Sequence, residues 1–331
     1  MNSKLLTKIL ALFITVVLLA LLFTQINYGD VITTLKNINS VYIVVGFILY
    51  TCSYFLRALR FHLLLNKEVS IKNLFHIECV HNMMNNLLPA RTGELSYVYL
   101  LKTEQNKTTG EGLATLIIAR IFDFIIITIL FLALFIFIGN LTSGFILLVI
   151  IGIIFLLSMV VLLIAMLFFG DDVLLRSKKF LMYFNFKKIQ LGTYITKKSE
   201  ETLTCLKMYK SGKFDQHLSV ILLSIGIWAL SYLLFYLIAI SMNLDLGVIP
   251  ILFASSFAVF STVLPIQGIG GFGTMEGGWA LGFIAVGATK DVAINTGFGF
   301  HLIILMYTIF LGISGYLKIF LLRNEKNEFT H

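Results

Sequence analysis

Residues 85–94 read NNLLPARTGE, and residues 263–276 read VLPIQGIGGFGTME. Each stretch interrupts an apolar segment with Leu-Pro, then a polar side chain two residues later, then glycine, and finally glutamate. Proline and glycine free backbone N–H and C=O groups that hydrocarbon cannot satisfy, so such backbone is tolerated only where it is buried in protein or lines a wet cavity. We therefore expect two helix breaks at membrane depth that line a cavity.

The rest of the chain is apolar enough to need a bilayer as its solvent. Of its 331 residues, 58% are hydrophobic and 13% are charged. A spanning helix needs about 20 apolar residues, and six runs reach that length: 5–23, 41–61, 113–138, 144–168, 218–240 and 298–321. The first run lacks a small-x-small cleavage site, so we expect a retained span and not a signal peptide. The predicted fold is an all-α integral membrane protein, a polytopic helical bundle in one membrane domain over residues 1–331.

The distribution of Lys and Arg predicts the orientation of the chain. The stretch 171–217 carries ten of them, whereas only Lys36 and Lys290 fall on the opposite side of the membrane. Because positive charge favours cytoplasmic loops, both termini are expected in the cytoplasm, in the cell (plasma) membrane. The first break then enters from the cytoplasmic face and the second from the outer face.

Because the two breaks enter the membrane from opposite faces, we predict two inverted repeats, each with a re-entrant or broken helical hairpin, as in secondary transporters. Repeat A covers about 41–138, repeat B covers about 218–322, and an amphipathic basic connector covers about 171–217. Lysines in this connector alternate with apolar residues, which favours a helix on an anionic membrane surface. Its tethering between two spans argues against nucleic acid as a partner.

An anion site is predicted where the two breaks meet. The half-helices after them, 95–101 and 277–289, begin with partial positive charge and unpaired N–H groups. The fork of Arg91 suits a phosphate. The predicted headgroup-binding residues are Arg91, Arg120, Asn85, Asn86, Gln267, Gly270 and Gly271, and the predicted hinges are Pro89, Gly93, Pro265 and Gly273.

Three intramembrane carboxylates are predicted to tune or neutralise those cations. Glu94 and Glu276 can alternatively serve only as first-turn caps of their half-helices, although a carboxylate at membrane depth costs about 2.5–3.5 kcal/mol. Either glutamate can instead bind a proton. Asp123 shares a helical face with Arg120, so the two form either a structural ion pair or a headgroup cation with its orienting carboxylate.

Other polar residues give weaker signals. Arg57 and Arg60 are expected to extend toward lipid headgroups at the inner end of their span. His301 is expected to be a hydrogen-bonded packing residue and not a metal ligand. The three cysteines lack metal-ligand spacing, so we expect no metal site and no cofactor, and we assign no catalytic residue.

Three motifs in order resemble the lysylphosphatidylglycerol synthase transmembrane-region family: the two breaks and the Arg-x-x-Asp at 120–123. The resemblance runs over about residues 5–322. It implies a flippase-like membrane protein handling aminoacyl-phospholipids or polyprenyl-phosphate-linked lipids. In bifunctional members a separate soluble domain performs aminoacyl transfer. This chain ends shortly after its last span, so a stand-alone member without lysyltransferase activity is expected.

The preferred function is translocation of a phosphate-bearing lipid. Two alternatives stay open: a membrane-embedded transferase on a lipid-linked donor, with Glu94 or Glu276 as general base, and an accessory subunit of a separate lipid synthase. The expected partners are anionic or phosphate-bearing lipids. A separate lipid-modifying enzyme and a second copy of the chain are candidate protein partners.

Overall fold

The computed structural model describes residues 38–139, 144–183, 190–263 and 267–328, together with Gly29 and Lys36. Its regular elements are helical throughout these residues. The predicted first span, residues 5–23, and the predicted hinge Pro265 lie outside the described residues. The all-α polytopic fold predicted from the sequence is confirmed.

The described helices form two sets with the same order of lengths. The first set comprises α3 (Ser40–Leu64), α4 (Ile71–Leu87), α5 (Glu94–Gln105) and α6 (Thr109–Phe137). The second set comprises α9 (Phe214–Ser241), α10 (Val248–Val263), α11 (Thr274–Ala285) and α12 (Lys290–Glu328). Two connecting helices, α7 (Ile146–Tyr183) and α8 (Gln190–Lys210), join them. Each set thus reads long, short, short, long.

Five helices are long and apolar enough to cross a membrane: α3, α6, α9, and the stretches Ile146–Met166 of α7 and Lys290–Leu321 of α12. They correspond to the five predicted runs in the described residues. The connecting region differs from its predicted boundary, because α7 continues as helix beyond residue 171 to Tyr183. The helix is longer than the apolar run because hydrogen bonding continues into polar sequence once a helix has begun.

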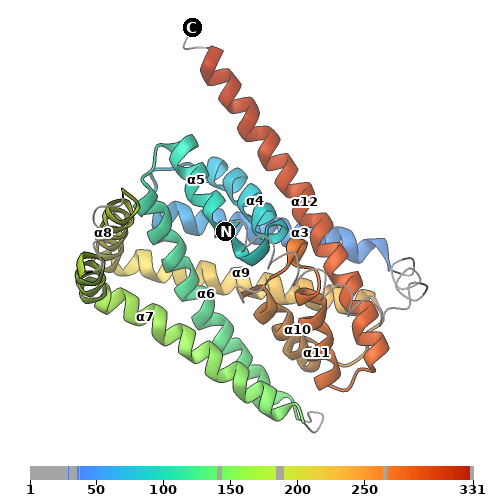
Figure 1. Ribbon diagram of the computed structural model, residues 1–331. Helices are drawn as coiled ribbons and strands as arrows, with labels where there is room; N and C mark the ends of the chain where they lie inside the picture. Colours follow the sequence, from blue (N-terminus) through green and yellow to red (C-terminus); the bar gives the residue numbers. More distant parts are fainter. Residues whose placement is uncertain are drawn as a thin grey trace, which may run out of the picture.

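Both predicted breaks fall between short helices. The first contains the 3₁₀ turn η1 (Pro89–Arg91), and the second contains the 3₁₀ turn η3 (Ile269–Gly271). The two turns contact each other, and η3 also contacts α4. Segments about 180 residues apart in the sequence therefore meet inside the bundle. Figure 1 shows the helices that flank the two turns, α4 and α5 for the first and α10 and α11 for the second.

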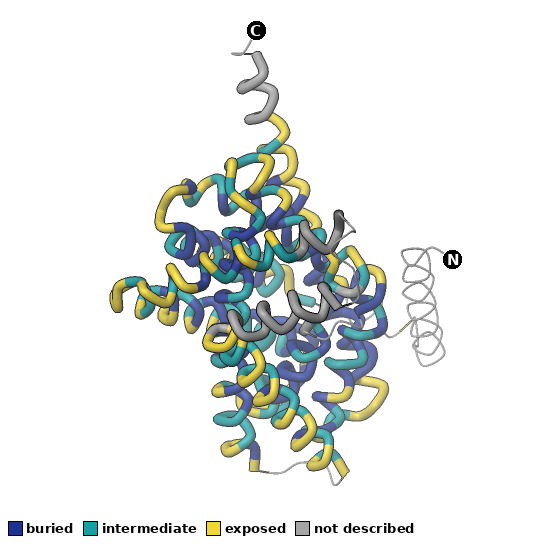
Figure 2. The backbone as a smooth tube through the Cα atoms, turned by 60° about the vertical axis from the view of Figure 1, so that its left-hand side comes forward, coloured by how far each residue is buried: buried dark blue, intermediate teal, exposed yellow. Residues whose placement is uncertain are grey.

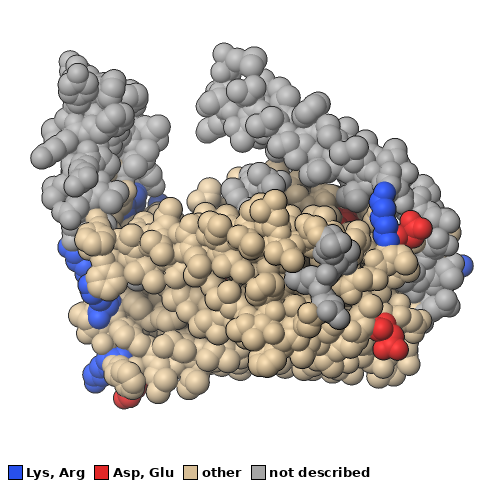
Figure 3. All heavy atoms as spheres, turned by 90° about the horizontal axis from the view of Figure 1, so that it is seen from below, with Lys and Arg blue, Asp and Glu red and all other residues tan. Residues whose placement is uncertain are grey.

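The interior is packed by side chains from both sets. Helix α3 lies against α9, and α12 lies against α4, so each set contributes to the packing of the other. Buried residues concentrate in the middle of the bundle, while residues 146–166 of α7 and 313–321 of α12 are more exposed (Figure 2). Many large apolar side chains of α7 face outward. The described atoms in the middle of the face in Figure 3 carry no Lys, Arg, Asp or Glu, as a lipid-facing surface requires.

Candidate headgroup-binding cavity

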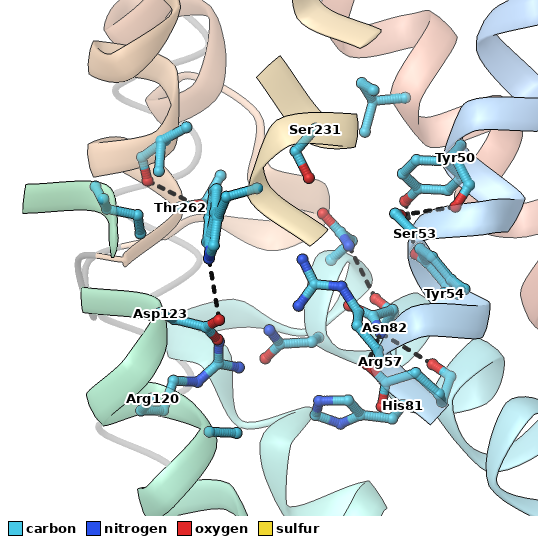
Figure 4. Close-up of a pocket in the computed structure, with 18 of the residues that line it drawn as sticks. Tyr50, Ser53, Tyr54, Arg57, His81, Asn82, Arg120, Asp123, Ser231 and Thr262 are labelled. Atoms are coloured by element: carbon cyan, nitrogen blue, oxygen red, sulfur yellow. Dashed lines mark hydrogen bonds and ion pairs between the residues drawn. The ribbon is translucent and has the colours of Figure 1, made fainter. Parts of the chain in front are cut away.

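A polar cavity of about 160 Å³ lies inside the bundle, between the two sets of helices. Four arginines line it: Arg57, Arg60, Arg91 and Arg120. Asn85, Asn86 and Gln267, which were predicted to bind a headgroup, also line it. Figure 4 shows side chains of α3, α4 and α6 projecting into this space from several directions. Among the sequence-predicted headgroup residues, Gly270 and Gly271 lie in η3 and are not among the lining residues.

The first charged group is a buried network around Asp123. Arg60 donates to both carboxylate oxygens of Asp123, from Nη1 to Oδ1 at 2.7 Å and from Nη2 to Oδ2 at 3.3 Å. Trp228 Nε1 donates to Oδ1 at 3.0 Å, and Arg60 Nη1 also donates to Ser224 at 3.0 Å. Arg60 is only 1% exposed. The expectation that Arg60 extends to lipid headgroups is wrong, because Asp123 supplies a buried counter-charge one helix away.

The second charged group centres on Glu94. One oxygen of Glu94 lies 3.0 Å from Arg91 Nη2 and 3.0 Å from Arg120 Nη2. Arg120 Nη1 is also 3.5 Å from Asp123 Oδ2, so Arg120 links the two groups. Arg91 Nη1 donates to the carbonyl of Thr262 at 2.6 Å and so joins the first break to α10. The carboxylate of Glu94 therefore holds two arginines at the cavity wall.

Arg57 differs from the other three cavity arginines. It makes no hydrogen bond or ion pair with any residue in the described part of the chain. Its side chain extends from α3 into the cavity (Figure 4). A cation in such a place is available to an anionic ligand.

Helix α4 contributes hydrogen-bonding atoms without a partner in the described part of the chain. Among the described residues, Glu78 Oε2, His81 Nδ1 and Asn85 Oδ1 are buried and unpaired. Glu78 Oε1 accepts from Asn82 Nδ2 at 2.7 Å, which fixes the orientation of the carboxylate. The cavity lining therefore carries unpaired polar atoms as well as cations.

Glu276 and His301 lie apart from the arginines. Glu276 forms no hydrogen bond or ion pair with an arginine among the described residues; its Oε1 lies 2.7 Å from Nδ1 of His301 on α12. Its Oε2 accepts from the Gly273 N–H at 2.9 Å, as a helix cap does. His301 Nε2 lies 2.9 Å from the carbonyl oxygen of Gly270. The pair fastens the second break to α12.

The two breaks do not correspond residue by residue when they are aligned at their prolines. In that alignment Gln267 is equivalent to Arg91, since each lies two residues after the proline. In the structure Arg91 ends η1 and Gly271 ends η3, and both have a positive φ, 55° and 74°. Gly93 and Gly273 then cap α5 and α11. The second break has extra residues before its turn, and Gly271 occupies the position of the Arg91 cation.

Sequence reasoning did not assign Arg57 or Trp228 to the site. Both line the cavity. The spacing of Arg57 and Arg60, three residues apart, was a usable signal, since both project from one face of a helix. Trp228 carried no such signal, because an aromatic residue in an apolar span has no distinguishing pattern.

The family description "Lysylphosphatidylglycerol synthase TM region" matches residues 8–312. The chain belongs to this family. All residues of the cavity and of both breaks lie within the matched range of the lysylphosphatidylglycerol synthase TM region. Membership and the spanning helices make it a multi-pass membrane protein of a lipid-related family.

Comparison with individual proteins gives a distant relative. A glycosyltransferase of Haloferax volcanii, AglD, is 27% identical over 125 residues, which is 37% of this chain and 20% of that protein. The chain thus spans well under two thirds of that relative. No solved structure matches the chain.

Proposed function

We propose that this chain translocates a phosphate-bearing lipid, with the headgroup in the polar cavity. The observation that carries the proposal is Arg57, a cation with no hydrogen bond or ion pair to any described residue, inside a cavity walled by three further arginines. An unpaired charge away from water is costly, so a site that keeps one is suited to a ligand of opposite charge. Arg91 and Arg120 are less available because Glu94 already pairs with both.

An apolar groove supports a lipid as the ligand. It measures about 870 Å³ and is lined by apolar and aromatic residues of α6, α9 and α10, including Phe122, Ile126, Tyr232 and Leu252. The same three helices also line the polar cavity. Lipid tails in the groove and a headgroup in the cavity would then contact the same helices.

Movement of the breaks supplies the step from one leaflet to the other in this proposal. The turns η1 and η3 meet at the cavity, and the predicted inverted repeats place them on hairpins that enter from opposite faces. A headgroup held between them is exposed to one face or the other as the hairpins shift. We extend the predicted roles accordingly: Arg91, Arg120 and Gln267 contact the headgroup, and Glu94 and Asp123 hold the arginines in place.

The proposal is tested in liposomes of defined composition that contain the purified protein. Fluorescent phosphatidylglycerol, aminoacyl-phosphatidylglycerol and a polyprenyl-phosphate sugar are the probes, and bleaching of outer-leaflet label measures translocation. We expect at least one probe to cross faster than in protein-free liposomes, and Arg57→Gln to slow it at least tenfold. Equal rates in wild type, Arg57→Gln and empty liposomes contradict the proposal.

A transferase acting on a lipid-linked donor is the second candidate, because the matched relative is named a glycosyltransferase. Mass spectrometry of the lipids after the same incubation separates the two functions. A new covalent lipid product favours the transferase, and movement of unchanged lipid favours translocation.

A further inference from the structure

The pair of Glu276 and His301 is buried where the headgroup cavity does not explain it. Glu276 is fully buried and His301 is 1% exposed. A cap for α11 needs only an oxygen acceptor, which Ser or Thr supplies without burying a charge. The second buried side chain, His301, also exceeds what a cap needs.

The partners of His301 fix its protons. Nε2 faces the carbonyl oxygen of Gly270, and because a carbonyl oxygen only accepts, Nε2 must carry hydrogen. Nδ1 faces Oε1 of Glu276 at 2.7 Å. That contact is a hydrogen bond only if one proton lies between the two atoms, either on Nδ1 beside a carboxylate or on Oε1 beside a neutral ring.

Gain or loss of a proton breaks one of the two contacts of His301. If the ring loses the hydrogen on Nδ1, a nitrogen lone pair and a carboxylate oxygen face each other as two acceptors; if it loses the hydrogen on Nε2, that nitrogen faces the Gly270 carbonyl oxygen as two acceptors. With one proton more, both atoms carry hydrogen and face each other as two donors. The geometry at His301 therefore holds for one protonation state of the pair, in which the pair has no net charge.

The contact also controls the shape of the second break. His301 holds η3 through Gly270, and Glu276 holds the start of α11 through the Gly273 N–H. Gly270, Gly271 and Gly273 all have positive φ, where glycine moves at little cost. Loss of the contact frees this glycine-rich segment from α12.

The same segment forms part of the cavity wall. Gln267 and Met275, on either side of η3, both line the headgroup cavity. A methyl group added at Gly271 would lie 3.0 Å from Gln267 Nε2 and 3.5 Å from His301 Nε2. A change at His301 thus reaches the cavity through one short segment.

Few other titratable groups in the described residues can compete for this role. Helix α10 has none, and Glu276 is the one such residue of α11. In the neighbouring first set, η1 carries Arg91, and α4 carries Lys72, His76, Glu78, Cys79 and His81. None of these six forms a hydrogen bond or ion pair with Glu276 or His301 within the described residues.

We propose that Glu276 and His301 form a proton-binding site that couples the second break to proton movement, so that a proton gradient drives translocation. The inference rests on the proposed function. The bound proton holds the segment against α12, and its release lets η3 and the start of α11 move. Each cycle then binds one proton from the water on one side of the membrane and releases it to the water on the other side.

Glu276→Gln tests the site with little risk to folding. The amide mimics the proton-bound carboxyl, since its oxygen accepts from Gly273 and its NH₂ donates to Nδ1. In liposomes with a pH difference, we expect wild type to translocate faster in one gradient direction than in the other and to move protons with the lipid. We expect Glu276→Gln and His301→Gln to lose both effects. The control Glu104→Gln, which removes a partly exposed carboxylate near the end of α5, should retain them.

Infrared difference spectra of the purified protein between mildly acidic and mildly alkaline buffer separate this inference from the function. We expect a band of the shared proton, from a carboxylic acid if it is on Oε1 or from the charged imidazole ring if it is on Nδ1, that changes with pH in wild type and in Glu104→Gln and is missing in Glu276→Gln. If the band is present without lipid movement, the proton site stands and the translocation proposal falls. An identical band and an identical gradient response in Glu276→Gln overturn the proton site.

Discussion

Two arginines one turn apart on α3 have different environments. Arg60 donates two hydrogen bonds to Asp123 and is shielded from solvent, whereas Arg57 extends into the cavity without a hydrogen bond or ion pair to any described residue. Burying a charge costs several kcal/mol unless a partner offsets it. The same residue type therefore stabilises the bundle at one position and is available to a ligand at the other.

Arg60→Ala is expected to destabilise the protein severely. It leaves the Asp123 carboxylate buried without its main partner, a change that typically costs about 3–5 kcal/mol. Thermal unfolding in detergent measures the loss. The double variant Arg60→Met with Asp123→Leu removes both charges and should recover most of the stability; a double variant as unstable as Arg60→Ala contradicts the pairing argument.

Arg57→Gln is expected to leave the melting temperature close to that of wild type, because no hydrogen bond or ion pair is lost among the described residues. Binding of an anionic lipid should weaken at least tenfold, as removal of a charged hydrogen bond costs about 1.5–3 kcal/mol. Native mass spectrometry with phosphatidylglycerol titrations gives the affinity. Arg57→Lys is the matched control: it keeps the charge and should lose less.

At the scale of the helices, glycines set how closely the short helices approach their neighbours. An added Cβ at Gly93 would collide with the backbone of Asn85, and one at Gly282 with the carbonyl of Ala254. Gly93 has an ordinary helical φ of −61°. Its predicted role as a hinge remains untested, and the structure gives it a packing role between α4 and α5.

Two adjacent glycines of α11 offer a controlled test of this packing. A Cβ at Gly278 would lie 2.7 Å from the Phe257 carbonyl oxygen, whereas a Cβ at Gly277 meets nothing within 4 Å. We expect Gly278→Ala to lower the unfolding free energy by about 1–3 kcal/mol. Gly277→Ala should be neutral or raise it by up to about 1 kcal/mol through helix propensity. Thermal melts of both variants decide; equal melting temperatures contradict close packing of α10 and α11.

At the scale of the molecule, the two sets of helices have the same order, and each packs against the other. Helix α4 lies against α12 of the second set, and α10 lies against α6 of the first. Packing of a short helix of each set against the last helix of the other set is expected if a two-fold axis relates the two sets. Opposite orientation in the membrane is the part of the prediction that remains to be measured.

Cysteine labelling measures that orientation. With Cys52, Cys79 and Cys205 replaced, single cysteines at the exposed positions Thr103 and Ser211 should react with an impermeant reagent only from the cytoplasmic face. Single cysteines at Asp245 and Thr289 should react only from outside. Labelling of Thr103 and Thr289 from the same face contradicts the inverted repeats.

Much of the fold was predictable because the bilayer imposes local rules. Apolar length alone located the five described spans, and proline and glycine at depth located both breaks. Intramembrane charge also identified Arg91, Arg120 and Asp123 as residues that meet in one place.

The pairing of those charges was decided only by tertiary structure. Asp123 is three residues from Arg120, yet its closest cation is Arg60, 63 residues away. Glu276 likewise pairs with His301 across two helices instead of with an arginine. Sequence spacing identifies neighbours along one helix, but a buried charge pairs with the group that packing brings nearest. Packing brings Asp123 to Arg60 and not to Arg57, so the two arginines have different roles.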